Sequence, residues 1–355
     1  MNITFLIGNG FDLRLGMKTK YTDMYNDYIN TDNADKIIKE FQKTLKTDAP
    51  KYETWADFEM GMAQYAQNFE NEDDFIKCIR DFKFFMINYL TEEQNKFFDF
   101  YNRNFLVEMD VLDEFEQSIT NFYDKQIPNV KKSLDNIANF TNKNKIINFI
   151  TFNYTGILEF IRDRFNLFAE IGSNHLLIDE IVHIHGDLNS NVVLGVDNAD
   201  QIKNVKFNIN RKVERAFIKP RFNHYYDIAR IELANDVLKN SDVICIYGLS
   251  LGESDLTWSK KIVNWLLSST LNQLFYFTYG TNKFENWNID AKMDEEDVLK
   301  MKLLERFGVS TLNAEKIYEQ IHIPVGEDIF NIYSILKSID NQELLNTIED
   351  NLVTV

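Results

Sequence analysis

Residues 3–16 read ITFLIGNGFDLRLG, in which an apolar run leads directly into a glycine-rich turn. Gly8 and Gly10 follow the run, and because glycine has no Cβ, a strand ending in such a turn lets the backbone approach a pyrophosphate. The full dinucleotide-binding fingerprint GxGxxG is not met, since Leu13 stands where the third glycine would be. The stretch therefore predicts either a nucleotide-binding loop or a tight strand-to-helix turn that binds no ligand.

Further apolar and β-branched runs predict the other strands of one sheet. Helical segments separate most of these runs, as is typical of a parallel sheet covered by helices on both faces. We therefore expect an α/β fold with a Rossmann-like sheet. The predicted strands are residues 3–7, 145–150, 181–185, 192–196, 242–247 and 274–278.

The stretch between the first two predicted strands is too long for a single crossover. Aromatic and apolar residues such as Phe58, Met62 and Tyr65 recur there at helical spacing. We interpret residues 19–140 as a large all-helical insertion after the first strand. Glu59, near the start of one of its helices, could reach the ligand crevice, or could serve only in capping and packing.

The remaining chain divides around this insertion. Residues 1–18 and 141–290 are assigned to the Rossmann domain, and residues 291–355 to a C-terminal helical segment packed on the core. Helical patterns in that segment cover residues 294–306 and 327–339, with Gly308 placed to end the first of them.

Composition and charge exclude several classes of protein. The net charge is −17, so the surface repels polyanions and we expect no direct nucleic-acid binding. Cys78 and Cys245 stand far apart without a metal-binding or redox motif, which indicates free thiols in a reducing compartment. No export signal and no run of about 18 apolar residues is visible, so we expect a cytoplasmic protein without a membrane span.

The segment TFNYT, residues 151–155, directly follows the second predicted strand. Open α/β sheets bind ligands at the carboxyl ends of their strands, where Asn153 could offer its amide to a ribose hydroxyl. The alternative is that Asn153 or a neighbouring threonine caps the helix that follows.

The segment HIHGD, residues 183–187, ends another predicted strand. Residues two apart on a strand point to the same face, so His183 and His185 could share a site if the strand stays extended through both. Gly186 after His185 favours a side chain that projects into an open crevice. A metal site formed by His183, His185 and Asp187 with His224 or Asp255 is an alternative, although a single HxHxD pattern often arises by chance.

The segment GLSLGESD, residues 248–255, contains the pattern GxSxG between a predicted strand and a helix. That setting makes Ser250 a candidate nucleophile. Against this, the helix is expected to begin at Ser254 or Asp255, and a triad in the usual order would have to use His322.

Five segments taken together in this order resemble the bacterial abortive-infection AbiH family, which is similar in turn to sirtuin-like domains. They are GNGFDLRLGMKTKYTDMY, WADFE, ITFNYT, HIHGDL and IYGLSLGESD, which begin at residues 8, 55, 150, 183 and 246. The resemblance extends over the chain to about Asp255.

The resemblance implies NAD as ligand or substrate in the sheet crevice. Asn153 and His185 match the catalytic Asn and His of sirtuin-like NAD hydrolases. The residues expected to contact the cofactor are Gly8, Asn9, Gly10, Phe11, Asp12, Gly186, Gly248, Ser250 and Asp255. The first loop reads GNG where sirtuins have GAG, Thr155 replaces a frequent Asp, and no four-cysteine module is present, so no metal is expected.

The activity that the resemblance implies is an anti-phage effector that hydrolyses the bond between nicotinamide and ribose. This cleavage releases a neutral leaving group and builds positive charge on the sugar, so it requires no strong acid. His185, with an ordinary pKa of about 6.5, would act as general base, and Asn153 would orient the attacked group.

Other functions stay open at this point. One is a defence module that senses a nucleotide or binds a partner without catalysis, since fold similarity does not establish function. Others are a metal-dependent or a serine-dependent hydrolase. A related nucleotide in place of NAD, a phage-derived protein as trigger and a homo-oligomeric state are all compatible with the sequence.

Overall fold

The central sheet has six parallel strands in the order β3-β2-β1-β4-β5-β6. This is the strand order of Rossmann folds, so the predicted fold class is confirmed. The strands are β1 (Asn2–Ile7), β2 (Lys145–Thr151), β3 (Leu176–His183), β4 (Val243–Tyr247), β5 (Gln273–Phe277) and β6 (Ile321–His322). The computed structural model describes residues 1–48, 58–122, 126, 128–141, 145–171, 176–278, 288–327, 329 and 330.

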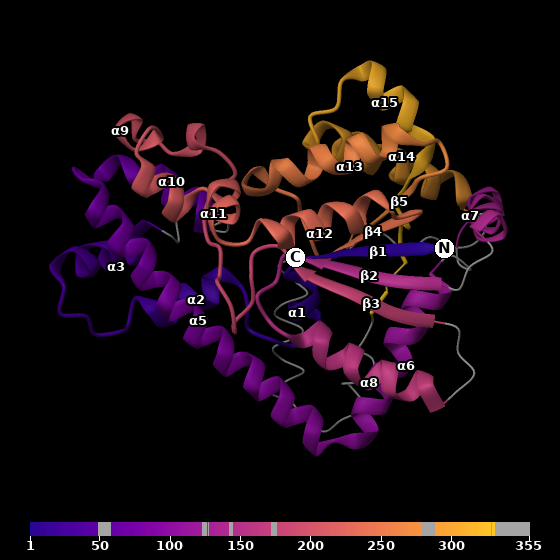
Figure 1. Cartoon of the computed structure of the whole chain (residues 1–355), viewed down its shortest axis with the longest axis horizontal. Coiled ribbons are helices and arrows are strands. Elements are labelled where there is room, and N and C mark those ends of the chain that lie inside the picture. Colours follow the sequence, from indigo (N-terminus) through magenta and orange to yellow (C-terminus); the bar gives the residue numbers. More distant parts are fainter. Residues whose placement is uncertain are drawn as a thin grey trace.

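Helices cover both faces of the sheet (Figure 1). Those between β1 and β2 are α1 (Gly10–Arg14), α2 (Tyr21–Tyr28), α3 (Lys36–Asp48), α4 (Phe58–Tyr65), α5 (Glu72–Arg103), α6 (Phe105–Asn121) and α7 (Pro128–Thr141). The helix α8 (Ile157–Ile171) precedes β3, and α9 (Val205–Asn208), α10 (Arg211–Phe217), α11 (Lys219–Tyr226) and α12 (Ile228–Lys239) precede β4. The helices α13 (Leu256–Ser268), α14 (Ile289–Arg306) and α15 (Thr311–Ile317) follow β4 and β5.

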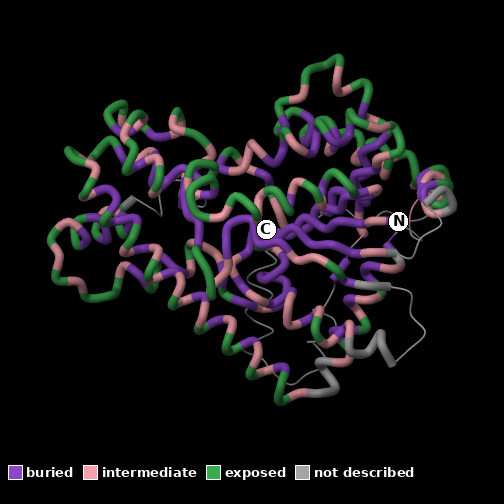
Figure 2. Tube along the Cα trace, viewed as in Figure 1, coloured by how far each residue is buried: buried purple, intermediate pink, exposed green. Residues whose placement is uncertain are grey.

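Alternate residues of β1 enter two different hydrophobic cores, as strand geometry requires. Phe5 points to the face covered by α6, α7 and α8, where it stacks on Phe149 with ring centroids 5.5 Å apart. Leu6 points to the opposite face, which α12, α13 and α14 cover. Nearly every residue of β1, β4 and β5 is consequently buried, as the purple tube in Figure 2 shows.

A third core lies outside the sheet. It is formed by α2, α3, α4 and the first half of α5, which lie beside α9 and α10 on the left of Figure 1. Residues 192–218, which the sequence places in the Rossmann domain, contribute Val192, Leu194 and Phe217 to this core. We name this group of elements the helical lobe.

The long helix α5 connects the helical lobe to the sheet. Its 32 residues correspond to about 48 Å at 1.5 Å per residue. Phe82 in its first half belongs to the core of the helical lobe, whereas Phe97 in its second half belongs to a core of the sheet. The Asn71 side chain caps its first turn by accepting from the backbone N–H of Asp74.

Four of the six predicted strands are confirmed as β1, β2, β4 and β5, and two predictions need correction. The prediction for residues 181–185 is wrong at its end, because β3 stops at His183 and the Gly186 N–H bonds back to the His183 carbonyl in a turn. The predicted strand at residues 192–196 is absent. Its apolar side chains are buried in the helical lobe, and the Val196 backbone pairs with residues 217 and 219 in an isolated bridge.

The C-terminal segment is described only in part. The predicted helix at residues 294–306 is α14, which begins five residues earlier at Ile289 and ends before Gly308, whose φ is +65°. The short edge strand β6 was not predicted, and the helix expected at residues 327–339 lies outside the described residues. Among the described helices, none combines the length and apolar character that a membrane span needs.

Candidate functional site

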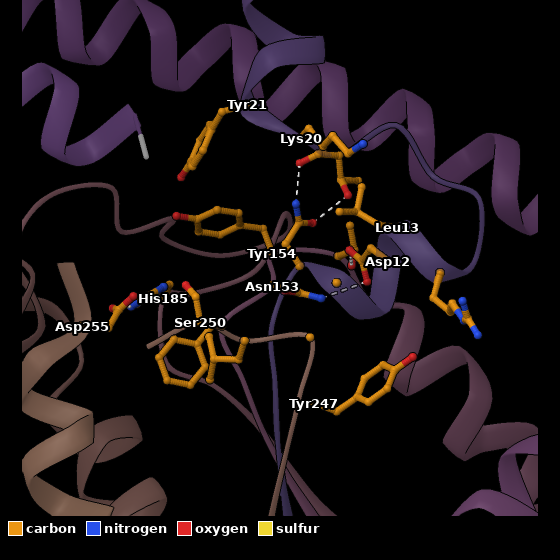
Figure 3. Close-up of a pocket in the computed structure, with 18 of the residues that line it drawn as sticks. Asp12, Leu13, Lys20, Tyr21, Asn153, Tyr154, His185, Tyr247, Ser250 and Asp255 are labelled. Carbon is orange, nitrogen blue, oxygen red and sulfur yellow. Dashed lines mark hydrogen bonds and ion pairs between the residues drawn. The ribbon is translucent and has the colours of Figure 1, made fainter. Parts of the chain in front are cut away.

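A cavity of about 980 Å³ lies at the carboxyl ends of the strands. In a sheet of this order, β1 and β4 are neighbours whose connections leave in opposite directions, and ligands bind at such a switch point. The loops after β1, β2, β3 and β4, together with α2 and α4 of the helical lobe, line it. Asn153 and His185, from different loops, lie on the same cavity (Figure 3).

The glycine loop after β1 packs directly against the turn after β4. A Cβ at Gly8 would lie 2.5 Å from the Gly248 carbonyl oxygen, and one at Gly10 would lie 2.6 Å from the Gly248 Cα. The Gly10 N–H donates to the Gly248 carbonyl, and the Phe11 N–H donates to the Gly8 carbonyl. Close contact between two backbones therefore accounts for these glycines without a ligand, and two N–H groups of the loop are already engaged.

Asn153 connects the loops after β1 and β2. Its side-chain N–H groups donate to the Gly8 carbonyl at 3.1 Å and to Asp12 Oδ1 at 2.9 Å. The Thr155 hydroxyl donates to the other oxygen of Asp12 at 2.6 Å. Burial raises the pKa of Asp12 to about 7, although both hydrogen bonds act to lower it. Asn153 therefore keeps only its Oδ1 to offer to a ligand.

His185 is held by a carboxylate at the opposite side of the cavity. Its Nε2 lies 3.2 Å from Asp255 Oδ1, and the same oxygen accepts from Lys219 Nζ at 3.0 Å. Lys219 also donates to Glu59 Oε2 at 2.7 Å. Burial and the charge of Lys219 lower the pKa of His185. At neutral pH this histidine is uncharged, with Nε2–H donated to Asp255 and Nδ1 able to accept a proton.

His183 does not face the same partners as His185. Its Nδ1 lies 2.9 Å from the Asn153 carbonyl and its Nε2 lies 2.8 Å from Glu159 Oε1. The expectation that both rings share one site depended on an extended strand, which ends at His183. Within the described part of the chain, no group of three His, Cys, Asp or Glu side chains could hold a metal ion.

Ser250 and His322 belong to different strands of the sheet, since Ser250 follows β4 and His322 lies on the edge strand β6, two strands away. Ser250 is exposed and follows the carboxyl end of β4. His322 is buried, and its Nε2 lies 2.7 Å from Oε1 of Gln273, the first residue of β5. Two inter-strand spacings of about 4.8 Å separate β4 from β6, so a proton cannot pass directly between the two side chains.

The sequence model of the family described as Bacteriophage abortive infection AbiH matches residues 4–277. The chain belongs to the AbiH family. The match extends from β1 through β5, so it includes every loop that brings Asn153, His185 and Asp255 to the cavity. A search of curated proteins gave no match. Membership implies a role in abortive infection by phage, whereas the likeness to sirtuins stays a prediction.

The other residues predicted to contact a cofactor have different places in this AbiH protein. Asn9 lines the cavity, and its amide exchanges two hydrogen bonds with Thr19, at 2.6 and 2.8 Å. The Phe11 side chain is buried against Tyr247 in the sheet core. Of the predicted residues, the cavity is lined by Asn9, Gly10, Asp12, Asn153, His185, Gly248, Ser250 and Asp255, and not by Gly8, Phe11 or Gly186.

The sequence did not indicate one central residue of this AbiH site. Lys219 is 5% exposed and lines the cavity from the start of α11. It stands in no glycine loop and follows no predicted strand, so only its spatial neighbours identify it. Glu59, its partner, does reach the crevice, which was one of two interpretations of its place at the start of a helix.

Proposed function

We propose that this AbiH protein binds NAD in the cavity and hydrolyses the bond between nicotinamide and ribose. The observation that carries the proposal is that His185, oriented by Asp255, lines one cavity together with Asn153. Catalytic bases are commonly held in this way by a carboxylate on the second ring nitrogen. We further propose that the activity is cytoplasmic, where it would deplete the NAD of an infected cell.

The size and lining of the cavity suit a dinucleotide. Small-molecule sites usually measure about 300 to 1,000 Å³, and this one lies near the upper end at about 980 Å³. Arg14 and Lys20 line it and bring positive charge for a pyrophosphate. Tyr247 and Tyr276 line it as well and offer apolar ring surface to a base.

The proposed reaction uses neutral His185 as the base and the ionised carboxylate of Asp255 as its partner. The bond between the nicotinamide nitrogen and the ribose carbon breaks, and its electron pair leaves with the neutral nicotinamide. Water then adds to the positively charged sugar carbon and transfers a proton to Nδ1 of His185. The carboxylate of Asp255 stabilises the imidazolium that results. The products are nicotinamide and ADP-ribose.

Asn153 has a narrower role in this mechanism than its sequence position suggests. Because both of its amide hydrogens are donated inside the protein, it can act on a ligand only as an acceptor. We propose that its Oδ1 accepts a hydrogen bond from a ribose hydroxyl or from the attacking water.

A non-catalytic nucleotide-binding module is the second candidate function. Two observations favour it. The Asn153 amide donates its hydrogen bonds inside the protein, and Gly8 packs closely on Gly248, so these motif residues hold loops together and do not need a ligand to explain them. This candidate predicts nucleotide affinity without product, and protection of cells that survives His185→Ala.

The deciding experiment measures nicotinamide and ADP-ribose by mass spectrometry during phage infection. We expect both products to rise with the unaltered protein and to fall by about 100-fold or more with His185→Ala. His224→Ala is the matched control, since His224 is exposed on α11 and lies outside the cavity. Because constant cleavage would kill the host, we propose a phage-derived trigger, and the assay of purified protein includes infected lysate. Equal product from wild type and His185→Ala would refute the mechanism.

A further inference from the structure

Four ionisable side chains, three of them buried and Asp255 13% exposed, form a continuous chain from the helical lobe to His185. Glu59 Oε2 lies 2.7 Å from Lys219 Nζ, which lies 3.0 Å from Asp255 Oδ1, which lies 3.2 Å from His185 Nε2. The side chains of Lys219 and Glu59 are only 5% and 7% exposed. Buried charges are costly unless they are paired, so an arrangement of this kind constrains every member.

Lys219 uses all of its donors inside the protein. Its ammonium group donates to Glu59, to Asp255 and, at 3.2 Å, to the Ser254 carbonyl. An ammonium has three N–H donors, so none is left for a phosphate or for a substrate. The paired charges also raise the pKa of Lys219, which excludes an uncharged amine acting as nucleophile.

The partners of Lys219 come from different parts of the fold. Glu59 lies on α4 in the helical lobe, and its other oxygen accepts from the Gly195 N–H at 3.0 Å. Asp255 lies before α13, beside the sheet. Lys219 therefore connects Glu59 of the helical lobe to Asp255, the carboxylate that holds His185.

We propose that Lys219 is the positioning residue of His185, and that Glu59 makes this positioning depend on the helical lobe. Lys219 fixes Asp255 in the orientation that accepts the Nε2–H of His185, and so directs Nδ1 toward the cavity. That the positioned His185 acts as a base rests on the proposed function. The contacts that position it do not depend on the identity of the substrate.

The charge arrangement makes opposite predictions for two variants. Among the described residues, the charged or titratable groups that face His185 are Asp255, Lys219, Arg230, Tyr154 and, through Lys219, Glu59. Lys219→Met removes the cation and leaves Asp255 as the nearest charge, so the pKa of His185 should rise by about 1 unit or more. Glu59→Gln removes an anion and leaves the Lys219 charge less compensated, so the pKa of His185 should fall.

Nitrogen-15 NMR of the full-length protein with labelled histidine tests this directly. The His185 resonances are assigned by their loss in His185→Gln, and their shifts report both the tautomer and the pKa. Lys219→Arg, which keeps the charge, should restore most of the wild-type value. Lys212→Met is the surface control, since Lys212 is 61% exposed and pairs with Glu72 and Asp73, away from the cavity lining.

Two outcomes would overturn the proposal. One is an unchanged pKa and tautomer of His185 in Lys219→Met while the His183 and His322 resonances show an intact fold. The other is an unchanged or raised pKa of His185 in Glu59→Gln. This second outcome tests the proposal even if Lys219→Met does not fold. Neither measurement requires NAD. If wild type cleaves no NAD yet both shifts occur, the proposed function fails and the positioning role stands.

A kinetic readout separates positioning from binding once NAD cleavage is measured. Loss of general-base orientation should lower kcat by about 10- to 100-fold in Lys219→Met and leave KM nearly unchanged. A higher KM with an unchanged kcat would instead assign Lys219 to substrate binding and would contradict the inference.

Discussion

The side-chain amide of Asn153 lies 2.9 Å from the carboxylate of Asp12, although 141 residues separate them in the chain. Asn153 lies in the loop after β2 and Asp12 lies on α1, directly after the neighbouring strand β1, and both line the cavity. The contact holds a buried carboxyl at the centre of the candidate site (Figure 3). Its protonation therefore couples the stability of the site to pH.

Asp12→Asn should make the protein less sensitive to pH. The pKa of Asp12 is raised from 3.8 to about 7, so the folded state binds this proton more tightly than the unfolded state. Its contribution to the free energy of unfolding falls as pH rises from about 4 to about 7, by up to about 1.4 kcal/mol per pH unit. Urea unfolding should show that the stability of Asp12→Asn increases relative to that of wild type as pH rises from about 5.5 to about 8.

The control for this experiment is Asp99→Asn, whose carboxylate is 70% exposed. Its unfolding free energy should follow that of wild type at every pH. Parallel curves for Asp12→Asn and wild type would show that Asp12 is ionised in the folded protein.

Gly248→Ala should destabilise the protein more than Gly308→Ala. Both glycines have a left-handed backbone, with φ of +63° and +65°, so each variant carries the same strain of about 1 to 2 kcal/mol. A Cβ at Gly248 would also meet the Phe11 nitrogen at 2.6 Å, whereas one at Gly308 would meet nothing within 4 Å. Chemical unfolding should give a further loss of about 1 to 3 kcal/mol for Gly248→Ala. Equal losses of stability in Gly248→Ala and Gly308→Ala would mean that the turn at Gly248 can move away from Phe11 without cost.

The sequence predicted the parts of this fold that depend on local pattern. Apolar and β-branched runs identified four strands, and residues that closely follow them, including Asn153, do line the cavity. The run at residues 192–196 has the same apolar character but is buried by helices instead of strands. Pattern alone cannot distinguish these two environments, since both require continuous apolar side chains.

Contacts between residues far apart in the chain could not be predicted from the sequence. Lys219 is 160 residues from Glu59 and 36 from Asp255, and no local motif indicates that they meet. The motif HIHGD predicts that His185 faces the crevice, and His185 does line the cavity. Whether His183 shares its site depends on where β3 ends, which the motif does not show. For the glycines after β1 the sequence allows either a nucleotide-binding loop or a tight turn without a ligand, and their nearest neighbour in the structure is the turn at Gly248.

Glu159→Gln should destabilise the protein mainly at acidic pH. Burial lowers the pKa of His183, but the hydrogen bond and charge of Glu159 outweigh it, so the net pKa is raised above 6.5. The resulting stabilisation is complete below about pH 6.5 and is lost as pH rises through the folded-state pKa. Above that pH, neutral His183 donates from Nδ1 to the Asn153 carbonyl, and its Nε2 can accept from a glutamine amide.

We expect Glu159→Gln to lose about 1 to 2 kcal/mol near pH 6 and much less near pH 8, measured by urea unfolding. Glu232→Gln, at an exposed position of α12, is the control and should show no such dependence. A loss that is the same at both pH values would indicate that the Glu159 charge does not act through His183.

Phe82→Ala should destabilise the helical lobe, whereas Phe84→Ala on the same helix should not. The Phe82 ring is fully buried and stacks on Phe58 with centroids 3.9 Å apart, while Phe84 is 68% exposed. A buried Phe→Ala change typically costs about 3 to 5 kcal/mol, and an exposed one lies within about 0.5 kcal/mol. Because the helical lobe has its own core, hydrogen exchange in Phe82→Ala should increase in α2 and α4 and remain slow in β1 and β4. Since α4 carries Glu59, the same variant should also disturb the Glu59–Lys219 pair. An equal increase of hydrogen exchange in the helical lobe and in the sheet would show that the two unfold as one unit.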